Sequence, residues 1–291
     1  MTVRTKHIDL LPYDPAWPHL FETEAEAIKQ ALGDNCLAIH HIGSTAVPGL
    51  SAKQDIDMCC VMKELPLSLA LEKIGYVFKG EFNIPLRFGF SKNTEFSKVN
   101  LHVVEPGHGF IKLNLCFRDH LRTHEADRMA YGRLKETLLK DPTAYERQGR
   151  FANYTLRKNA FIKDILTKAG FEELIVNFCE HTLEWEAAKR LRQQASADLE
   201  NFDVWTFDHP EHVHLVLYQG TTIVGYAHIQ RGPENRATIR TLVIDASFQN
   251  QGLEEHFLTV IKTWLKSQSF NHSVIPGLVP LTSREAGAKK V

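Results

Sequence analysis

Residues 40–58 read HHIGSTAVPGLSAKQDIDM. The run ends by alternating charged and apolar residues, and successive side chains of a strand point to opposite faces. Asp55 and Asp57 would therefore share one face of a strand, roughly 6.6 Å apart at their Cα atoms. Ile56 would point the other way, toward a core. Upstream, Gly43-Ser44 predicts a tight turn that a phosphate can approach, because glycine has no side chain and the turn offers hydrogen-bond donors.

Two close carboxylates ionise together at low cost only when a cation lies between them. Mg²⁺ suits such a pair, since it takes one or two carboxylates and completes its shell with water and phosphate oxygens. A Gly-Ser turn, a spacer of residues 45–54 and Asp-x-Asp on the next strand resemble the signature of the nucleotidyltransferase fold. The resemblance implies that Asp55 and Asp57 bind the metal and are catalytic. An ordinary turn followed by two solvated aspartates fits the same residues, and both interpretations stay open at this point.

The composition sets outer bounds on the class of protein. The chain has 291 residues, 43% of them hydrophobic and 24% charged, with a formal net charge of −1. These values are typical of a globular protein with one large or two ordinary domains, and they argue against a general nucleic-acid binder. The sequence has no transmembrane-length apolar run and no signal-peptide core, so we expect a cytoplasmic protein without a membrane partner. The five cysteines lack zinc spacing, which favours buried free thiols.

Periodicity predicts a mixture of helices and strands over the first region. Asp14-Pro15 is typical of a helix start, and apolar residues recur at helical spacing from there to Gly33. A second cap-and-proline signal at Asp141-Pro142 predicts a helix that runs to Lys168. Leu113–Phe117 fits either a strand or the start of a helix. The other expected elements are strands on both sides of the Gly43-Ser44 turn, strands over 76–78, 86–90 and 99–104, and helices over 67–74 and 126–140.

Several segments of this region fit one family pattern. They are residues 13–18 (YDPAWP), 41–50 (HIGSTAVPGL) with Ala52-Lys53, Gly75-Tyr76, 101–104 (LHVV), 117–119 (FRD) with Leu121-Arg122 and His124, and Phe161-Ile162. Through them, residues 11 to about 169 resemble the GrpB family, which is built on the nucleotidyltransferase fold. That family is poorly defined biochemically, so the resemblance implies a fold and a site more than a substrate.

Two features depart from the expected pattern. Many GrpB members carry an apolar residue where this chain has Asp55, so the acidic pair is more complete here. The third carboxylate of active nucleotidyltransferases should lie on a neighbouring strand, but Asn100-Leu101-His102 has none, and Asn100 and His102 share its face instead. His102 fits either a catalytic ligand of a metal or phosphate or a hydrogen-bonded structural residue.

Phosphate binding would also need cations. Lys53 and Arg87 are the candidates, since arginine suits bidentate pairing with phosphate oxygens. With Gly43 and Ser44 they form the expected substrate- or phosphate-binding set. Both also fit solvated surface charges.

The sequence changes character from Phe171 onward. Phe171–Gln194 predicts a helix, whereas Val213–Tyr218 and Thr222–Ile229 predict the two strands of a hairpin. Ala237–Ile244 predicts a third strand. The next apolar residues fall at i, i+4, i+7, i+8, i+11 and i+12, the pattern of an amphipathic helix packed on a sheet. They are Leu253, Phe257, Val260, Ile261, Trp264 and Leu265.

The loop between that strand and that helix is an expected anion site, because a helix N-terminus has free N–H groups and the positive end of the dipole. The order hairpin, strand, Q-x-x-G loop and helix over about residues 200–270 resembles the GNAT acetyltransferases. A helix cap without a ligand is the alternative. The resemblance implies that the pyrophosphate of acetyl-CoA lies against Gln249, Asn250, Gln251, Gly252 and Leu253, and that its pantetheine arm pairs with Leu242, Val243 and Ile244.

This second region also departs from its family. Glu254 puts a negative charge beside the expected anion. Only His272–Val291 follows the helix, prolines interrupt it, and no tyrosine follows Tyr226 to act as a general acid. We therefore expect a smaller, truncated GNAT-like domain, completed by another chain or by the first domain. The candidates for a general base are then His228 or a bound water.

Together these patterns predict an α/β (α+β) protein with domains at residues 1–170 and 171–291. The first expected function is acetyl-CoA-dependent N-acyl transfer to a small-molecule or nucleotide-like substrate. The second is metal-dependent nucleotidyl transfer with a degenerate accessory domain, and the third is non-catalytic binding of nucleotide or CoA. Acetyl-CoA and Mg²⁺ are the expected cofactors. The sequence is compatible with a homo-oligomer and does not decide the oligomeric state.

Overall fold

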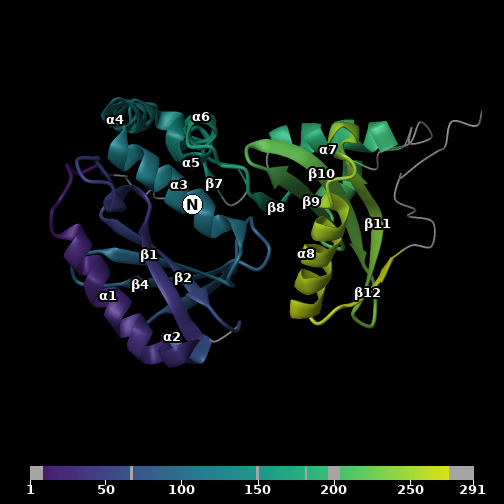
Figure 1. Ribbon diagram of the computed structural model, residues 1–291, viewed down its shortest axis with the longest axis horizontal. Coiled ribbons are helices and arrows are strands. Elements are labelled where there is room, and N and C mark those ends of the chain that lie inside the picture. The colour runs from purple at the N-terminus through teal and green to yellow at the C-terminus, as the bar shows by residue number, and fades with distance from the viewer. Residues whose placement is uncertain (1–8, 66–67, 149–150, 181, 196–203, 275–291) are drawn as a thin grey trace, which may run out of the picture. The chain divides into compact units, whose positions relative to one another are not determined.

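Figure 1 shows the computed structural model, which describes residues 9–65, 68–148, 151–180, 182–195 and 204–274. The chain divides into two compact units, residues 1–82 with 86–173 and residues 83–85 with 174–291. Each unit contains a five-stranded sheet together with helices, which confirms the expected α/β class. The domain boundary expected between residues 170 and 171 stays a prediction.

The first unit is built on a mixed sheet with the strand order β1-β2-β5-β4-β3. β2 and β5 run parallel, and the other neighbouring pairs run antiparallel. The elements are α1 Trp17–Leu32, a 3-10 turn Gly33–Asn35, β1 Cys36–Ile42, a 3-10 turn Ser44–Ala46, β2 Asp55–Met62, α2 Ser68–Lys73, β3 Val77–Glu81, β4 Phe88–Asn93 and β5 Lys98–Val104.

The two faces of this sheet differ as the alternation in the sequence predicts. Ile56 and Met58 are fully buried in a core that includes Trp17 and Ile28 of α1, and α1 lies along this face of the sheet (Figure 1). The opposite face carries Asp55 and Asp57, which are half-buried. One face is therefore sealed by apolar packing, and the other is available for a polar site.

Four helices complete the first unit and enclose a second, smaller core. The loop before β2 contributes Val47 and Leu50 to this core, where they pack with Leu121, Tyr131 and Ile165. Residues 113–117, for which the sequence fits either a strand or the start of a helix, lie within the helix α3. The helices are α3 Gly109–Thr123, α4 Glu125–Leu139, α5 Asn153–Leu156 and α6 Asn159–Lys168.

The single helix expected from Asp141 to Lys168 is wrong. Asp141 does cap a helical turn, since its Oδ1 accepts from the Thr143 N–H at 2.9 Å, but this turn is a short 3-10 helix, Pro142–Tyr145. The buried Asn153 donates from its side chain to the Thr143 carbonyl at 2.9 Å, ten residues away, which fits a chain that turns back here and does not continue as a helix. Two short strands, β6 Arg147–Gln148 and β7 Phe151–Ala152, and α5 then precede α6.

The second unit has the strand order β12-β11-β10-β9-β8, antiparallel except for the parallel pair β11 and β12. The hairpin and the third strand are confirmed as β9, β10 and β11. The elements are β8 Leu174–Phe178, α7 Thr182–Ala195, a 3-10 turn Val204–Phe207, β9 His212–Gln219, β10 Thr222–Arg231, β11 Arg236–Ile244, a 3-10 turn Ala246–Phe248, α8 Leu253–Ser267 and β12 Asn271–Val274.

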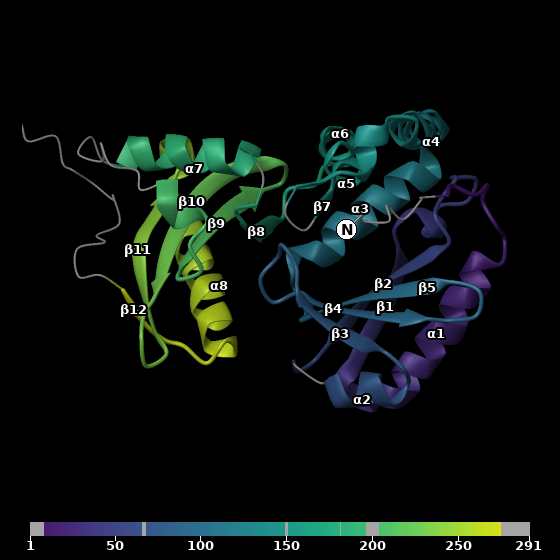
Figure 2. The same ribbon diagram turned by 180° about the vertical axis from the view of Figure 1, so that it is seen from behind.

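Helices α7 and α8 lie on opposite faces of this second sheet, as the front and rear views together show (Figures 1 and 2). The predicted apolar stripe of α8 is confirmed, since its members are buried except for the half-buried Val260. Burial of each such side chain contributes about 1.5–3 kcal/mol before entropy is counted, so α8 is firmly docked. The helix expected over Phe171–Gln194 is wrong at its start, because the β-branched residues Ile175 and Val176 are buried in a strand, β8.

Two expectations drawn from composition can be compared with the described ranges. There, no helix is both long enough and apolar enough to cross a membrane. All five cysteines are free thiols, and Cys59, Cys60 and Cys179 are buried, as the absence of zinc spacing predicts.

Candidate functional site

The Gly43-Ser44 turn packs directly on the carboxylate of Asp57. Gly43 has φ of +72°, a conformation that residues with a side chain adopt only with strain. A Cβ at this position would lie 2.4 Å from Oδ2 of Asp57, so only glycine lets the turn approach so closely. From the neighbouring strand, Asn100 Nδ2 donates to Asp57 Oδ1 at 2.9 Å. The turn, the carboxylate and the amide thus meet on one face of the sheet.

Positive charges surround that carboxylate. Lys53 and Lys158 both interact electrostatically with Asp57, and their Nζ atoms stand 5.2 and 4.4 Å from the ring centroid of Tyr154. Burial raises the pKa of Asp57 to about 6, although the Asn100 hydrogen bond and the two lysines oppose the rise. Burial and the charge of Lys53 lower the pKa of Lys158 to about 8. Ammonium groups and carboxylates therefore share one partly desolvated site.

Lys135, on α4, is almost fully buried against the same turn, with 2% of its surface exposed. Its Nζ lies 3.2 Å from Oγ of Ser44 and also donates to the main-chain carbonyl of Ser51. The ring of Tyr131 faces the amine, with its centroid 4.8 Å from Nζ. Burial, assisted by the charge of Lys158, lowers the pKa of Lys135 to about 7. An amine that changes protonation near neutral pH therefore stands beside Ser44.

A chain of hydrogen bonds ties the turn to β2. The Thr45 hydroxyl donates to the Asp55 carbonyl at 3.1 Å, and Nε2 of His41 lies 3.1 Å from the same hydroxyl oxygen. Because a hydroxyl carries one hydrogen, His41 is the donor to Thr45. Burial and the charges of Arg122 and Arg118 lower the pKa of His41 to about 4. The ring is therefore neutral near pH 7, and its bond to Thr45 persists over the physiological range.

Two arginines of α3 bind the main chain on either side of the turn. Arg118 Nη1 donates to the His41 carbonyl and Arg122 Nε donates to the Ala46 carbonyl, both at 2.8 Å. Arginines at i and i+4 lie on one helix face, so a single helix supplies both donors. This contact explains why the FRD-LR segment and the HIGSTAVPGL segment belong to one sequence pattern.

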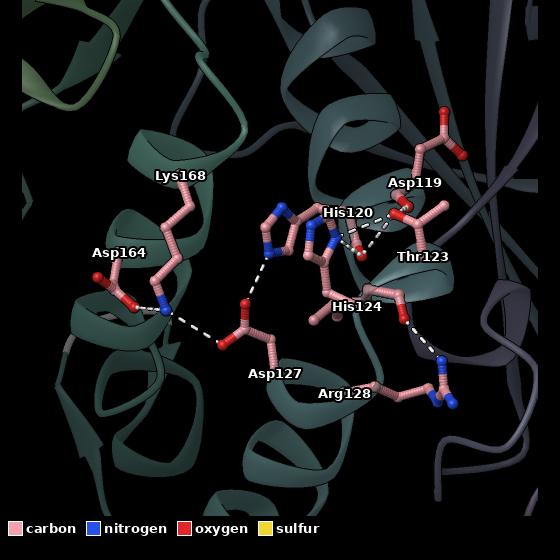
Figure 3. Close-up of polar contacts among 9 residues, drawn as sticks. Asp119, His120, Thr123, His124, Asp127, Arg128, Asp164 and Lys168 are labelled. Carbon is pink, nitrogen blue, oxygen red and sulfur yellow. Dashed lines mark hydrogen bonds and ion pairs between the residues drawn. The ribbon is translucent and has the colours of Figure 1, made fainter.

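A second network joins the helices that carry these groups (Figure 3). Asp127 of α4 lies between His120 of α3, at 2.7 Å from Nε2, and Lys168 of α6, at 3.1 Å from Nζ. The hydrogen bonds from His120 and Lys168 hold the pKa of Asp127 below its usual range. His124 stacks on His120 with 3.9 Å between ring centroids. One carboxylate thereby fixes three helices around the turn.

Arg87 and His102 form a pair of their own on the polar face. Arg87 is 7% exposed, and its Nη1 lies 3.2 Å from Nδ1 of His102. Its guanidinium stands 5.2 and 5.1 Å from the ring centroids of Phe82 and Phe110. Burial and the charge of Arg87 lower the pKa of His102 to about 3, so the ring is neutral and accepts from the guanidinium. The phosphate-binding role of Arg87 and the catalytic role of His102 stay predictions.

In the second unit, residues 249–252 form an exposed loop between β11 and α8. Asp245 starts the connection, since its Oδ1 accepts from the Ser247 N–H at 3.0 Å. Asn250 and Gly252 have φ of 62° and 74°, and Gly252 is the N-cap of α8, with no side-chain cap hydrogen bond. The first N–H groups of a helix have no intrahelical partner. The loop therefore leads into a set of main-chain donors.

One edge of β11 is paired over only part of its length within the described residues. β12 pairs with Arg236–Ile239, whereas β10 pairs along the other edge as far as Ile244. Strand main-chain groups alternate between the two edges, so Leu242–Ile244 presents hydrogen-bonding groups on the side that β12 leaves unpaired. This is the geometry that the pantetheine prediction needs, and the roles of these residues stay predictions.

His228 lies in a buried cluster of histidines on β9 and β10. Its Nε2 is 2.8 Å from Nδ1 of His212, and its ring stacks on that of His214 with 4.4 Å between centroids. Burial, followed by the neighbouring His214 and His212, lowers the pKa of His228 to about 3. A buried imidazole with so low a pKa is a weak proton acceptor, which argues against the basic role expected for it.

A model of the GrpB protein family matches residues 7–168, more than half of the chain. The chain belongs to the GrpB family. A UPF0157 protein of Halalkalibacterium halodurans is 36% identical over 167 residues, which cover 56% of this chain and 83% of the relative. A UPF0157 protein of Bacillus subtilis is 33% identical over 137 residues, which cover 46% of this chain and 40% of the relative. The crystal structure of a conserved GrpB protein from Enterococcus faecalis shares 36% identity with a TM-score of 0.49, covering 55% of this chain and 96% of that one.

Residues 179–276 match the model of the acetyltransferase (GNAT) family. The chain therefore joins a GrpB region to a GNAT region, and the sequence resemblance to both families is confirmed. The mixed sheet belongs to the GrpB region, and the sheet that carries the Gln249–Gly252 loop belongs to the GNAT region.

The donor set of the GrpB site fits a divalent cation poorly. Mg²⁺ needs an octahedral shell of oxygen ligands, but the strand beside Asp57 offers Asn100 and His102 in place of a carboxylate. Among the described residues, no group of three or more His, Cys, Asp or Glu side chains is placed to hold a metal ion. Metal binding by Asp55 and Asp57 stays a prediction, and the ammonium groups beside them do not favour it.

Sequence reasoning missed several residues of these sites. Lys135 could have been found from the sequence. It follows Tyr131 by four residues and so lies on the same face of α4, at a position where the helical period predicts an apolar side chain and the chain has a lysine. His212 and His214 alternate along one strand, which places them on one face. Lys158 had no such signal, since its position depends on the unexpected break between α5 and α6.

Proposed function

We propose that the GNAT region is an acetyl-CoA-dependent N-acyltransferase that acts on a small molecule. The observation that carries the proposal is the exposed Gln249–Gly252 loop, which connects β11, paired along one edge over only part of its length by the described residues, to the N-terminus of the well-anchored helix α8. A pyrophosphate would be bound by main-chain N–H groups at that helix end. The pantetheine arm would add to Leu242–Ile244 along the edge that residues 9–274, so far as the structure describes them, leave unpaired, as a peptide adds to a sheet edge.

In this proposal, most of the rate acceleration comes from positioning the amine substrate against the bound thioester. Holding an amine against a bound thioester makes the reaction effectively unimolecular, a gain worth about 7–11 kcal/mol in well-oriented systems. The amine nitrogen attacks the thioester carbonyl, CoA leaves as the thiolate, and the amine proton passes to solvent or to the thiolate. Gln249, Asn250, Gln251, Gly252 and Leu253 would bind the pyrophosphate, and the amine substrate is not specified.

Two substitutions at one position test the cofactor site. Gly252→Asp and Gly252→Asn insert side chains of nearly equal size, both of which tolerate positive φ and cap helices well. Only the aspartate repels a pyrophosphate. We expect CoA titrated by calorimetry to bind Gly252→Asp at least about tenfold more weakly than Gly252→Asn, a difference of about 1.4 kcal/mol. Equal affinities, or no binding of CoA by the unmodified protein, would remove the acyltransferase proposal.

For the GrpB region we propose binding of a nucleotide or another phosphate-bearing small molecule. The supporting observation is the close packing of Gly43 on Asp57, with Lys53 and Lys158 acting on that carboxylate and Lys135 beside Ser44. Metal-dependent nucleotidyl transfer, with Asp55 and Asp57 on Mg²⁺ and His102 nearby, is the alternative. Calorimetric titration of AMP and ATP in EDTA and in Mg²⁺ separates the two, because the alternative requires that binding disappear in EDTA.

A further inference from the structure

Lys135 is an unusual residue for the interior of a domain. The described residues place no carboxylate within ion-pair distance of its Nζ, whose hydrogen-bond partners are Ser44 and Ser51. A buried ammonium without a counter-ion is costly, and the amine responds by losing its proton more readily. Ser44, by contrast, is half-exposed at the turn. A buried, uncompensated amine therefore lies directly behind the half-exposed Ser44, whose hydroxyl also hydrogen-bonds the side chain of Tyr131.

The charged groups around Lys135 come from several elements. Glu136, its neighbour on α4, raises its proton affinity, whereas Lys158 at the start of α6 lowers it, and Tyr131 faces it with a neutral ring. The carboxylate of Asp57 interacts with Tyr131 and Lys158. Lys158 and Lys135 thus repel each other when both are charged, and Glu136 offsets this repulsion only in part.

We propose that the GrpB region binds a phosphate monoester against Ser44 without a divalent metal, with Lys135 and Lys158 supplying the positive charge and Lys135 taking up one proton when the anion binds. This inference rests on the phosphate-binding function proposed above and goes further by naming the ligand class, the cations and the proton. The neutral amine accepts the proton from solvent, and the resulting ammonium keeps its donor bond to the Ser51 carbonyl. No covalent bond forms or breaks.

The same arrangement explains why a metal is not required. Lys158 and Lys53 already oppose the charge of Asp57, and an ammonium is a strong point charge for phosphate oxygens. The arriving dianion relieves the repulsion between Lys135 and Lys158, so its charge and the added proton stabilise each other. Binding should therefore be tighter at lower pH as long as the ligand keeps both of its charges.

Sulfate is the cleanest probe, because its charge does not change near neutral pH and every proton taken up must come to the protein. Calorimetry near pH 8 in EDTA, in two buffers with different heats of ionisation, measures that uptake. We expect Lys135 to take up about 0.8 proton per sulfate, since an amine with a pKa of about 7 is mostly neutral at that pH and an adjacent dianion favours its charged form. Lys158, with a pKa of about 8, should add a smaller share. AMP in the same buffers tests the monoester class.

Matched variants separate the site from general charge effects. Lys135→Met keeps the length of the side chain and should lower the proton uptake by about 0.8 per sulfate, leaving only the share of Lys158, and should weaken sulfate and AMP binding at least about tenfold. Lys140→Met removes an exposed lysine just beyond α4 and should change neither quantity. Should Lys135→Met fail to fold, Ser44→Ala removes the bridging hydroxyl and should weaken binding while leaving Lys135 in place.

Three results would overturn the inference. Binding that appears only with Mg²⁺ would remove the metal-free site and leave the phosphate-binding function standing. Metal-free binding without proton uptake, or equal binding by Lys135→Met, would remove the role of Lys135 alone. No binding of sulfate or AMP to the unmodified protein with or without Mg²⁺ would remove both this inference and the proposed function of the GrpB region.

Discussion

The glycine turns at Gly43 and Gly252 have similar positive φ angles and very different surroundings. A Cβ at Gly43 would meet Asp57, and side chains of α3 and α4 bind the nearby main chain. A Cβ at Gly252 would meet nothing within 4 Å, and the adjoining loop is exposed. A glycine between a strand and a helical turn therefore precedes two kinds of candidate anion site, one built from charged side chains and one from main-chain N–H groups.

The difference has physical consequences for how each site responds to conditions. Amines and carboxylates change charge with pH, whereas peptide N–H groups at a helix end keep their partial charge at every pH. The enclosed site should be sensitive to pH and to small changes in shape. The open site should depend chiefly on the conformation of the loop and on charges placed next to it.

The largest change in the free energy of unfolding is expected when each of the two glycines is replaced by alanine. Gly43→Ala forces both backbone strain and a collision with the Asp57 carboxylate, and we expect a loss of about 3–4 kcal/mol in the free energy of unfolding. Gly252→Ala suffers the strain alone, so a loss of about 1–2 kcal/mol is expected. Urea unfolding of both variants measures the contrast. Equal losses would show that the first turn is no more enclosed than the second.

The second prediction uses pH to sharpen the comparison. Lys135 has a folded-state pKa of about 7, well below the unfolded value, so the unfolded chain binds the extra proton between the two values. Stability contributed by this group therefore increases as pH rises through that window, by about 1.4 kcal/mol per unit. Relative to Lys135→Met, the unmodified protein should gain about 2–3 kcal/mol between about pH 7 and pH 9.

Parallel denaturant titrations of the two proteins across that range measure the change. A constant difference in the free energy of unfolding would mean that Lys135 stays charged in the folded protein. No variant in the Gln249–Gly252 loop should reproduce this dependence, because that loop contains no ionisable side chain.

A smaller effect is expected from the carboxylate that joins α3, α4 and α6. Asp127→Asn replaces two charge-assisted contacts by weaker ones and should cost about 1 kcal/mol near neutral pH. His120 and Lys168 lower the pKa of Asp127, so this contribution is present above the unfolded pKa and is lost as pH falls through the folded one. Asp164→Asn, which removes only an exposed helix pair with Lys168, is the control and should cost a few tenths of a kcal/mol at most. If both variants lose a similar free energy of unfolding, the contacts of Asp127 stabilise the protein no more than an exposed ion pair does.

The smallest effect concerns the open site. Glu254 is half-buried in the first turn of α8, and burial raises its pKa. Glu254→Ala should tighten CoA binding about two- to fivefold by removing a like charge, while costing a few tenths of a kcal/mol of helix stability. Glu255→Ala removes an exposed acid of the same turn and should change affinity less. If Glu254→Ala only destabilises the protein and CoA binds neither form, the loop is a vestigial site.

Much of the fold could be predicted because its signals are local. The alternation of Asp55, Ile56 and Asp57 gives the two faces of β2, and the spacing of Leu253, Phe257 and Ile261 gives the docked face of α8. The region after Asp141 could not be predicted in the same way. There the chain folds back so that the Asn153 side chain bonds the carbonyl of Thr143, a contact ten residues apart that local propensity does not reveal.

The candidate sites were predictable only in part, for a related reason. Motif spacing places Gly43 and Asp57 together, since each is fixed by its own strand. Lys135 and Lys158 reach the same site from helices far along the chain, and only the tertiary packing decides that they meet. Arg87 and His102, which the sequence does single out, hydrogen-bond each other in the folded chain, a contact that motif spacing does not reveal.

The arginine contacts to the turn have a consequence for how the GrpB region folds. Arg118 and Arg122 bind carbonyls that lie 77 and 76 residues earlier in the chain. Contacts of such high sequence separation require the closure of a long loop before they return any stabilisation, so they form late and slowly. Hydrogen exchange at residues 43–50 should therefore report opening of the site at a lower free energy than global unfolding, with the sheet still intact.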